Sequence, residues 1–481
     1  MTQSIVVSIG QCGNQIGSRF WDLALREHAT INPKNNFDSA YQSFFRNVDP
    51  SSQQDLGVGG KVKSLKARAV MIDMEERVIN CVMQGPLRDL FEHTQTVTDV
   101  SGSGNNWAVG FYEYGSRYEE SIVEVVRQAS EHCDALQSFF LLHSMGGGTG
   151  SGLGTRVLNI LHEHFPDIYR FVVPVYPSID QDDVITSPYN SVLAMHQLTE
   201  HADVILPIEN AALDRLVNTV SKKLTQSGDT LGSTQSGSKS GQKSSSCYSS
   251  AGSLQKEEQA FDSMNNLVAH LLLNLTASSR FEGSLNVDLN EVTMNMVPFP
   301  RMQYLTSSQC PLYSLKDLRL PARNLDQMFS NSFSAEYQLL EADPKHDIYI
   351  ACALLLRGAN VTLSDVRRNI DKMRKQTKFM HWNEDGWKAG ICSVAPVGLP
   401  YSLLNVSNSL CIRHTFSSLE NRFLKLYRRK ANLHHYTRVD NMTADVVADA
   451  AESLRSQILE YEGLVLQANN PPAQVPRLQV L

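Results

Sequence analysis

The stretch Gly146-Gly147-Gly148-Thr149-Gly150-Ser151-Gly152 lies between an apolar run that ends near Met145 and a segment with helical periodicity. Glycines let the backbone approach an anion closely, and the free N–H groups and positive end of a following helix favour phosphate. The chain lacks both the G-x-x-x-x-G-K-[ST] and the G-x-G-x-x-G pattern. We therefore predict a phosphate-binding loop from another class of nucleotide fold. A flexible surface turn is the weaker interpretation in this strand–loop–helix setting.

Short apolar runs alternate with helical patterns on both sides of this loop. Near-continuous apolar runs suit the buried strands of a parallel sheet. We predict such strands at Ser4–Ile9, Arg68–Ile72, Phe139–Leu142 and Phe171–Tyr176, and helices at Tyr118–Cys133 and Leu153–His164. This alternation predicts an open, doubly wound α/β sheet, in which ligands bind at the carboxyl ends of the strands.

The middle of the chain changes in composition. Residues 218–260 are dominated by Ser, Gly, Lys and Gln, which predicts a disordered insertion. Apolar residues from Phe261 to Leu275 then recur at helical spacing and predict a long helix between two halves of the molecule. We predict a nucleotide-binding domain over residues 1–217, a core helix with a second domain over 261–414, and helices with a non-acidic tail over 415–481.

Composition excludes several classes of protein. The 481 residues carry a formal charge of −7, without the basic excess of a nucleic-acid-binding protein. No apolar run reaches the roughly 18–20 residues that span a bilayer, and the first residues lack a signal-peptide pattern. The eight cysteines form no C-x-x-C pair. We predict a soluble protein with reduced thiols that binds neither nucleic acid nor membrane.

Three glycine-containing motifs together resemble the tubulin superfamily. The 146–152 stretch is similar to its GGGTGSG signature, and it is joined by GQCGNQIG at 10–17 and GSGNNW at 102–107. The resemblance runs nearly end to end, apart from the 218–260 insertion, part of 31–64 and the tail. It implies a tubulin/FtsZ-like α/β fold: a Rossmann-like GTP-binding domain, a long core helix, a mixed α/β intermediate domain and a C-terminal helical region. It also implies GTP or GDP with Mg²⁺ as cofactors.

The resemblance further implies which residues hold the nucleotide. The set is Gln11, Cys12, Asn14, Gly102, Gly104, Asn105, Ser144, Gly146, Gly147, Gly148, Thr149, Gly150, Asp183, Asn210, Phe261 and Asn265. The amides of Asn210 and Asn265 would read guanine, and the ring of Phe261 would stack on it. Asp73 and Glu75 would hold Mg²⁺ through water. Taken without the resemblance, Cys12 and Phe261 fit an ordinary apolar core equally well.

Two positions depart from the family pattern. Ser187 precedes the Pro-Tyr-Asn triplet where many members carry Glu, so a carboxylate contact to the ribose is lost or replaced. Phe261 stands where Tyr is usual, which keeps the stacking surface and removes a hydroxyl.

Two carboxylates bear on hydrolysis. Asp288 and Glu291 are three residues apart at the start of a predicted helix, a spacing that by itself most often serves helix capping. In alpha-type tubulins the residue matching Glu291 orients or activates water against the γ-phosphate held by the longitudinally adjacent subunit, whereas beta-type tubulins carry Lys. The resemblance thus implies catalytic residues that act on a neighbouring subunit's nucleotide.

Within the superfamily the chain resembles the epsilon branch, through the Ser-rich insertion, residues 320–329, Asp343–His346 and the non-acidic tail. That branch implies a structural or assembly component of centrioles and basal bodies, located in the cytoplasm, the cytoskeleton and the centrosome. Its partners would be other tubulins of delta or alpha/beta type, bound by longitudinal contacts, and centriolar proteins. Two alternatives stay open: a free-standing GTPase, and a microtubule-independent binding module with GTP or GDP as a fixed cofactor.

Overall fold

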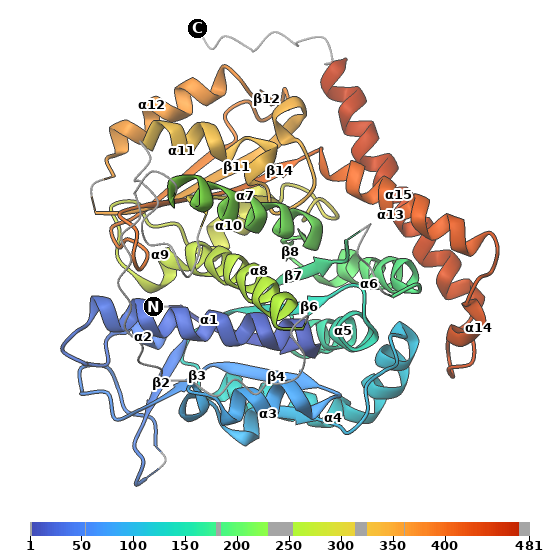
Figure 1. Ribbon diagram of the computed structural model, residues 1–481, viewed down its shortest axis with the longest axis horizontal. Helices are drawn as coiled ribbons and strands as arrows, with labels where there is room; N and C mark the ends of the chain where they lie inside the picture. The colour runs from blue at the N-terminus through green and yellow to red at the C-terminus, as the bar shows by residue number, and fades with distance from the viewer. Residues whose placement is uncertain are drawn as a thin grey trace, which may run out of the picture.

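The computed structural model describes residues 2–52, 54–178, 184–228, 254–312, 325–359 and 361–470. Its elements surround two β-sheets, one built from the first half of the chain and one from the second, with helices at the C-terminal end (Figure 1). Asp183, the middle of the predicted insertion and the last residues of the tail lie outside the described residues.

The first sheet is parallel throughout. Its strands are β1 (Gln3–Ile9), β4 (Ala69–Asp73), β5 (Thr96–Thr98), β6 (Leu136–Ser144), β7 (Tyr169–Tyr176), β8 (Val204–Ile205) and β9 (Ile208–Glu209). The order is β5-β4-β1-β6-β7-β8, with β9 also paired to β7. The four predicted strands are confirmed. The order reverses between β1 and β6, so the carboxyl ends of these two strands border the crevice where such sheets bind ligands.

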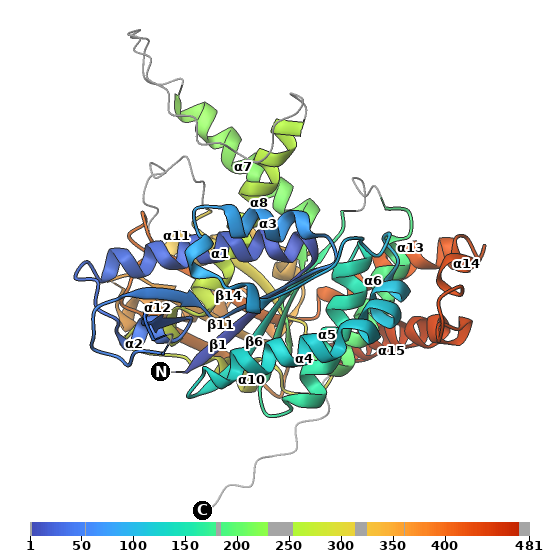
Figure 2. The same ribbon diagram turned by 90° about the horizontal axis from the view of Figure 1, so that it is seen from below.

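Helices cover both faces of this sheet (Figure 2). On one face lie α1 (Gly10–Ile31), α3 (Glu76–Gln84) and α8 (Leu254–Leu275), and on the other α4 (Gly115–Glu131), α5 (Gly154–His164) and α6 (Ser187–His201). Strand side chains alternate between the two faces. Val6 therefore packs in the core beneath α1 and α8, while Ile5 and Val7 pack in the core beneath α4 and α5.

Several local features were not anticipated from the sequence. Within 31–64 and just beyond, α2 (Ser39–Gln42) precedes an antiparallel pair, β2 (Phe45–Val48) and β3 (Ser64–Ala67). Single π-helical turns, Val109–Tyr114 and Thr149–Leu153, lead into α4 and α5. Such turns often occur at functional sites. Here the first packs against the glycine loop and the second forms the end of that loop.

The predicted insertion is shorter than 218–260. Helix α7 runs from Asn210 to Gly228 and α8 begins at Leu254, so both ends of the segment are helical. In the sequence, Leu216, Val220 and Leu224 continue a helical spacing into the Ser-rich region. Helix α8 contacts α1 on one side and strands of the second sheet on the other, as the predicted connection between the halves requires.

The second sheet is mixed. It contains β10 (Thr306–Cys310), β11 (Ile348–Arg357), β12 (Lys378–Phe379), β13 (Trp387–Cys392) and β14 (Ser402–Ser409), with α9 (Ala277–Arg280), α10 (Leu289–Met296), α11 (Leu325–Ser332) and α12 (Leu363–Arg374) around it. The chain continues through α13 (Ile412–Tyr427), α14 (Leu433–Tyr436) and α15 (Ala444–Asn469). In the described part of the chain, no helix combines the length and the apolarity needed to cross a membrane.

Candidate functional site

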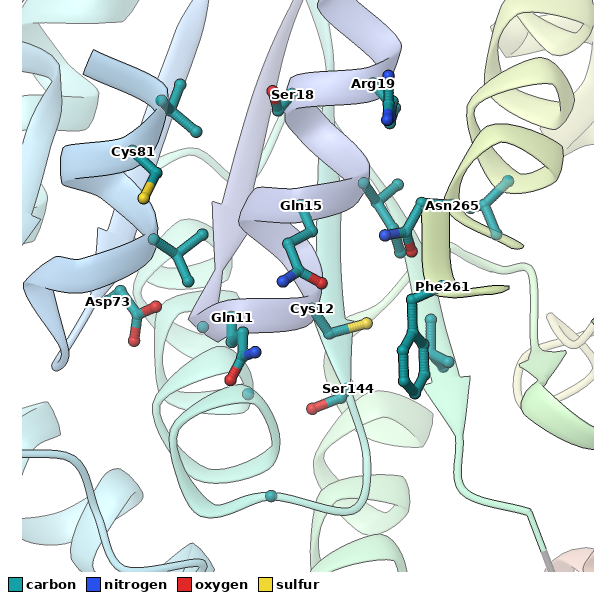
Figure 3. A pocket seen from close by; sticks show the side chains of 18 of the residues that line it. Gln11, Cys12, Gln15, Ser18, Arg19, Asp73, Cys81, Ser144, Phe261 and Asn265 are labelled. Carbon is teal, nitrogen blue, oxygen red and sulfur yellow. The ribbon is translucent and has the colours of Figure 1, made fainter. Parts of the chain in front are cut away.

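A cavity of about 1260 Å³ opens at the carboxyl ends of β1, β4 and β6, between α1, α3 and α8. Figure 3 shows side chains from these helices and strands around it. The predicted residues that line it are Gln11, Cys12, Asp73, Glu75, Gly104, Asn105, Ser144, Gly147, Gly148, Thr149, Gly150, Asn210, Phe261 and Asn265. Residues more than 250 positions apart therefore share one cavity wall.

Three glycines of the loop line the cavity, Gly147, Gly148 and Gly150, and the last two are tightly packed. A Cβ atom at Gly148 would lie 2.5 Å from the backbone nitrogen of Asn106, and one at Gly150 would lie 2.6 Å from Ser144 Oγ. A Cβ atom at Gly147 would instead meet nothing closer than 3.6 Å. The glycines at 148 and 150 thus allow neighbouring loops to pack, and Gly147 presents open backbone to the cavity.

Asn14 does not line the cavity. It is buried in α1, where its side-chain amide donates to the carbonyl oxygens of Gly10 (3.0 Å) and Ile72 (3.1 Å). Its Oδ1 accepts a hydrogen bond from Ser8 Oγ at 3.0 Å. Asn14 therefore holds the turn after β1 against the end of β4, and it acts on the cavity through that turn.

Gly102 and Gly146 also lie outside the cavity wall. Gly102 lies beneath the Glu75 side chain, and Gly146 packs near Pro177. The carbonyl oxygen of Gly146 accepts a hydrogen bond from Asn190 Nδ2 (2.8 Å), which donates to the Asn105 carbonyl as well (2.9 Å). Asn190 thus joins two of the loops. Its place in the Pro-Tyr-Asn triplet was the signal from which sequence reasoning could have found it.

The helical part of the wall brings three predicted residues together with one that was missed. Phe261 and Asn265 on α8 face α1, which presents Cys12 and Gln15 (Figure 3). Phe261 is 53% exposed, whereas the apolar residues of α8 from Met264 to Leu275 are buried, and its ring contributes to the cavity wall. Burial raises the pKa of the Cys12 thiol to about 12, so the group is neutral near pH 7. Gln15 follows Gln11 by one helical turn, a spacing that predicts the same face.

Asp73 ends β4 at the cavity wall with one carboxylate oxygen lacking a partner. The residue is 2% exposed, its Oδ2 has no hydrogen-bond partner, and burial raises its pKa to about 6. Glu75 lies two residues on and also lines the cavity. Among the described residues no three His, Cys, Asp or Glu side chains form a metal cluster. Mg²⁺ usually takes only one or two carboxylates plus substrate phosphates, so these two residues fit it.

The predicted catalytic pair lies elsewhere. Asp288 caps α10, where its Oδ1 accepts from the Leu289 backbone (2.9 Å), and its Oδ2 accepts from Gln137 Nε2 (2.5 Å). Gln137 is at the amino end of β6, whereas Ser144 at the other end lines the cavity. At about 3.3 Å per residue, roughly 23 Å of strand separates the two positions.

Glu291 lies on the first turn of α10, one turn beyond Asp288, and forms an ion pair with Lys388 of β13. Both side chains are partly exposed. The ion pair was not anticipated, because Lys388 is almost 100 residues further along the chain. The pair therefore belongs to the amino edge of the sheet, on the far side from the cavity.

Comparison with known proteins agrees with this arrangement. Residues 3–218 match the family described as Tubulin/FtsZ family, GTPase domain, and residues 300–421 match the Tubulin C-terminal domain. The chain is 54% identical to the tubulin epsilon chain of Homo sapiens over 483 residues, covering 100% of both chains. The chain belongs to the tubulin family. It is 53% identical to the tubulin epsilon chain of Mus musculus, again over 100% of both, and 31% identical to a tubulin beta chain of Porphyra purpurea over 97% of this chain and 94% of that one.

Membership in the tubulin family confirms the predicted fold class, with its GTPase domain, second domain and C-terminal helices. The GTPase domain implies GTP or GDP as the ligand of this family member, and other tubulins as its partners.

Proposed function

We propose that this tubulin binds a guanine nucleotide with Mg²⁺ in the cavity between α1, α3 and α8, and that hydrolysis is completed across a subunit interface. The observation that carries the proposal is the separation of the two sites. The cavity lies at the carboxyl edge of the first sheet, and Glu291 lies beyond its amino edge. One copy of the chain cannot bring Glu291 to its own nucleotide, whereas two copies stacked end to end can.

In this proposal the cavity residues divide the work of binding. Open backbone at Gly147 and the hydroxyl of Thr149 would face the phosphates. Asn210 and Asn265 would read the guanine edge, and Phe261 would stack on the base. Asp73 and Glu75 would hold Mg²⁺, which when bound neutralises phosphate charge. Each of these groups lines the cavity.

At the other edge, Glu291 would orient the attacking water against the nucleotide of the adjacent subunit. Asp288 fixes the start of α10 through its cap and its bond to Gln137, and so positions Glu291 one turn later. The Lys388 ammonium holds the Glu291 carboxylate on the outer surface. The sequence analysis assigned both carboxylates to catalysis; in this proposal Asp288 would position α10 and Glu291 would act on the neighbouring nucleotide.

The test is Glu291→Ala in the full chain. We expect the GTP dissociation constant of the isolated protein to stay within about threefold, because Glu291 is remote from the cavity. Assembly-linked GTP hydrolysis should fall at least about 100-fold, the usual loss when a positioned group in phosphoryl transfer is removed. Phosphate release would be measured over a range of protein concentrations, with the tubulin partner included where the chain alone does not assemble.

Asp371→Ala, which removes an exposed carboxylate from α12, serves as the matched control and should leave both quantities unchanged. Loss of GTP binding by the isolated Glu291→Ala protein would assign the residue to its own cavity or to the fold. A specific hydrolysis rate that is constant over all protein concentrations would favour a free-standing GTPase.

The cellular role we propose is that of a structural or assembly component of centrioles and basal bodies, in contact with other tubulins of delta or alpha/beta type. It is supported by 54% identity to a tubulin epsilon chain over 100% of both chains. A tagged copy should concentrate at centrioles. An even distribution along cytoplasmic microtubules would contradict the proposal.

One observation keeps the fixed-cofactor alternative in view. Ser187 is fully buried at the start of α6, does not line the cavity, and its hydroxyl has no hydrogen-bond partner. Ser187 cannot supply the carboxylate contact to the ribose that Glu provides in many relatives, so that contact would be lost or replaced. Nucleotide content of the purified protein, followed in excess labelled GTP, separates the two cases: complete replacement supports a working GTPase, and retention of the original nucleotide over many hours supports a fixed cofactor.

A further inference from the structure

An ion pair joins the two helices that form the base-side wall of the cavity. Arg19 Nη2 on α1 lies 2.6 Å from Asp262 Oδ2 on α8, and both residues line the cavity. Arg19 follows Gln15 by one helical turn, and Asp262 directly follows Phe261. Figure 3 shows Arg19, Gln15 and Cys12 in sequence along α1, opposite the α8 surface that carries Asn265 and Phe261.

The pair is not needed to hold α1 and α8 together. The two helices share a buried apolar core, in which Phe20 and Ala24 of α1 pack in one cluster with Leu267 and Leu271 of α8. The Asp262 side chain is 55% exposed, and exposed ion pairs contribute little to folding. Breaking the Arg19–Asp262 pair should therefore leave the fold intact and affect only the side of the cavity that lies between α1 and α8.

The Arg19–Asp262 pair lies across the side of the cavity next to Phe261 and Asn265, the predicted base-binding residues. The Arg19–Asp262 ion pair joins α1 to α8 at this wall, one helical turn beyond Gln15 and next to Phe261. A ligand held between Cys12, Phe261 and Asn265 has the Arg19–Asp262 link along its edge. Separation of α1 from α8 at this point, which widens the cavity, requires the link to open.

We propose that Arg19 and Asp262 form a clasp over the base side of the cavity that slows release of bound guanine nucleotide. The inference rests on the proposed nucleotide site and adds a control on exchange to it. The clasp acts on the rate of release, and it is electrostatic, so salt weakens it. The expected size is that of one solvent-accessible ion pair, about two- to fivefold in the release rate.

The experiment follows dissociation of a fluorescent GDP analogue from the full chain after mixing with excess GTP. Arg19→Gln and Asp262→Asn should each speed release about two- to fivefold, and the double variant no more than either alone, since both remove the same link. Raising the salt concentration should speed release from the parent protein and have less effect on the variants. Exchanging the charges, Arg19→Asp with Asp262→Arg, should restore slow release.

Arg127→Gln provides the matched control. Arg127 pairs with Glu124 at 2.7 Å within α4, joins no second helix through that pair, and does not line the cavity. Its loss should not change the release rate. Unchanged release from both Arg19→Gln and Asp262→Asn would overturn the clasp and leave the nucleotide site standing. Failure of the parent protein to bind the GDP analogue at all would overturn the proposed function, and the clasp with it.

Discussion

The carboxyl edge and the amino edge of the first sheet are built in different ways. At the carboxyl edge, loops from positions 10, 102 and 146 pack so closely that Gly148 and Gly150 have no room for a side chain. At the amino edge, Asp288 and Glu291 are held by side-chain contacts to Gln137 and Lys388. A site built from closely packed backbone tolerates few substitutions. A site built from side chains can change its chemistry when a single residue is replaced. If the proposed function holds, nucleotide binding would depend on backbone packing at the carboxyl edge, and hydrolysis would depend on the side chains at the amino edge of a neighbouring subunit.

The sharpest way to test the backbone edge is Gly147→Val. Because a Cβ atom at Gly147 meets no atom closer than 3.6 Å, the variant should fold normally. Its side chain would occupy the space where a phosphate approaches the backbone. We expect the affinity for GTP to fall by at least about 1000-fold, which corresponds to more than about 4 kcal/mol. Calorimetric titration measures the affinity, and thermal melting in the absence of nucleotide checks the fold.

Gly148→Val makes a useful contrast. A side chain there collides with the Asn106 backbone, so this variant should lose stability with or without nucleotide. Tight GTP binding by Gly147→Val would show that the phosphates do not pass this point. In that case the assignment of the loop would be wrong, although the fold would be unaffected.

A second prediction concerns the buried ion cluster that joins α1 to the second sheet. Glu27, near the end of α1, pairs with Arg280 Nη1 at 2.7 Å and with Arg357 Nη1 at 3.0 Å, and all three side chains are buried. Burial by itself would raise the Glu27 pKa, but the charges of Arg357 and Arg280 outweigh it and hold the pKa at about 2. Glu27→Gln would leave two buried guanidinium groups without an anion and should cost about 3–5 kcal/mol of stability.

The measurement is the free energy of unfolding by urea. Since the Glu27 pKa is lower in the folded protein than in the unfolded chain, its contribution is complete above about pH 4.5 and is lost as pH falls toward 2. The difference between parent and variant should therefore be constant from pH 6 to 8. A loss below 1 kcal/mol would mean that the three-residue ion cluster does not hold α1 to the second sheet.

Sequence reasoning succeeded where local pattern reflects local structure. Strands β1, β4, β6 and β7 are apolar because both of their faces are covered, and that pattern identified them. Strand β10 was not found, because its residues Thr306–Cys310 are mostly polar and yet buried. Gln309 Nε2, for example, donates to the Leu267 carbonyl at 3.0 Å. A buried polar strand is satisfied by partners from distant segments, which no local pattern shows.

The candidate site divides in the same way. The glycine loops were visible because a run of glycines is a local signal. Lys388 beside Glu291, and Arg19 beside Asp262, were not predicted, since each pair joins segments about 100 or more residues apart. Asn14 was assigned to the cavity because it stands beside Gln11 and Cys12 in the motif, but its helical position turns it toward Gly10 and Ile72.

A third prediction uses the Asp73 carboxylate, whose Oδ2 has no hydrogen-bond partner while its Oδ1 accepts from the Glu75 backbone. In the nucleotide-free protein its pKa is raised to about 6 by burial, so the ionised form is disfavoured on folding. Stability from this group is therefore lost as pH rises from about 4 to above 6, and at pH 7 the cost is of order 3 kcal/mol. Asp73→Asn should stabilise the nucleotide-free protein at pH 7 and weaken Mg²⁺-dependent GTP binding about 10- to 100-fold.

Thermal melting without ligand measures the expected gain in stability, and melting with Mg²⁺·GTP measures the expected loss of binding. The stabilisation that Mg²⁺ adds should be larger at pH 7.5 than at pH 5.5 in the parent protein, and it should lose most of this pH dependence in Asp73→Asn. Glu336→Gln, which changes an exposed carboxylate that does not line the cavity, should behave as the parent does. Equal Mg²⁺ dependence in parent and Asp73→Asn would move the metal to another ligand.

The smallest effect on hydrolysis is expected at Lys388. It tests whether side chains at the amino edge set the hydrolysis rate on the neighbouring subunit. The ion pair with Glu291 is partly exposed on both sides, so Lys388→Met should change stability by less than about 1 kcal/mol. Nucleotide affinity should not change, because the pair is remote from the cavity. Assembly-linked hydrolysis should fall about five- to tenfold, since the ammonium both holds Glu291 and adds positive charge where the neighbour's phosphates would lie. Lys388→Arg, which keeps the charge, should recover most of the rate, and Lys372→Met on α12 should have no effect. Faster hydrolysis by Lys388→Met would show that the lysine restrains Glu291. The ion pair would then slow hydrolysis and would not promote it.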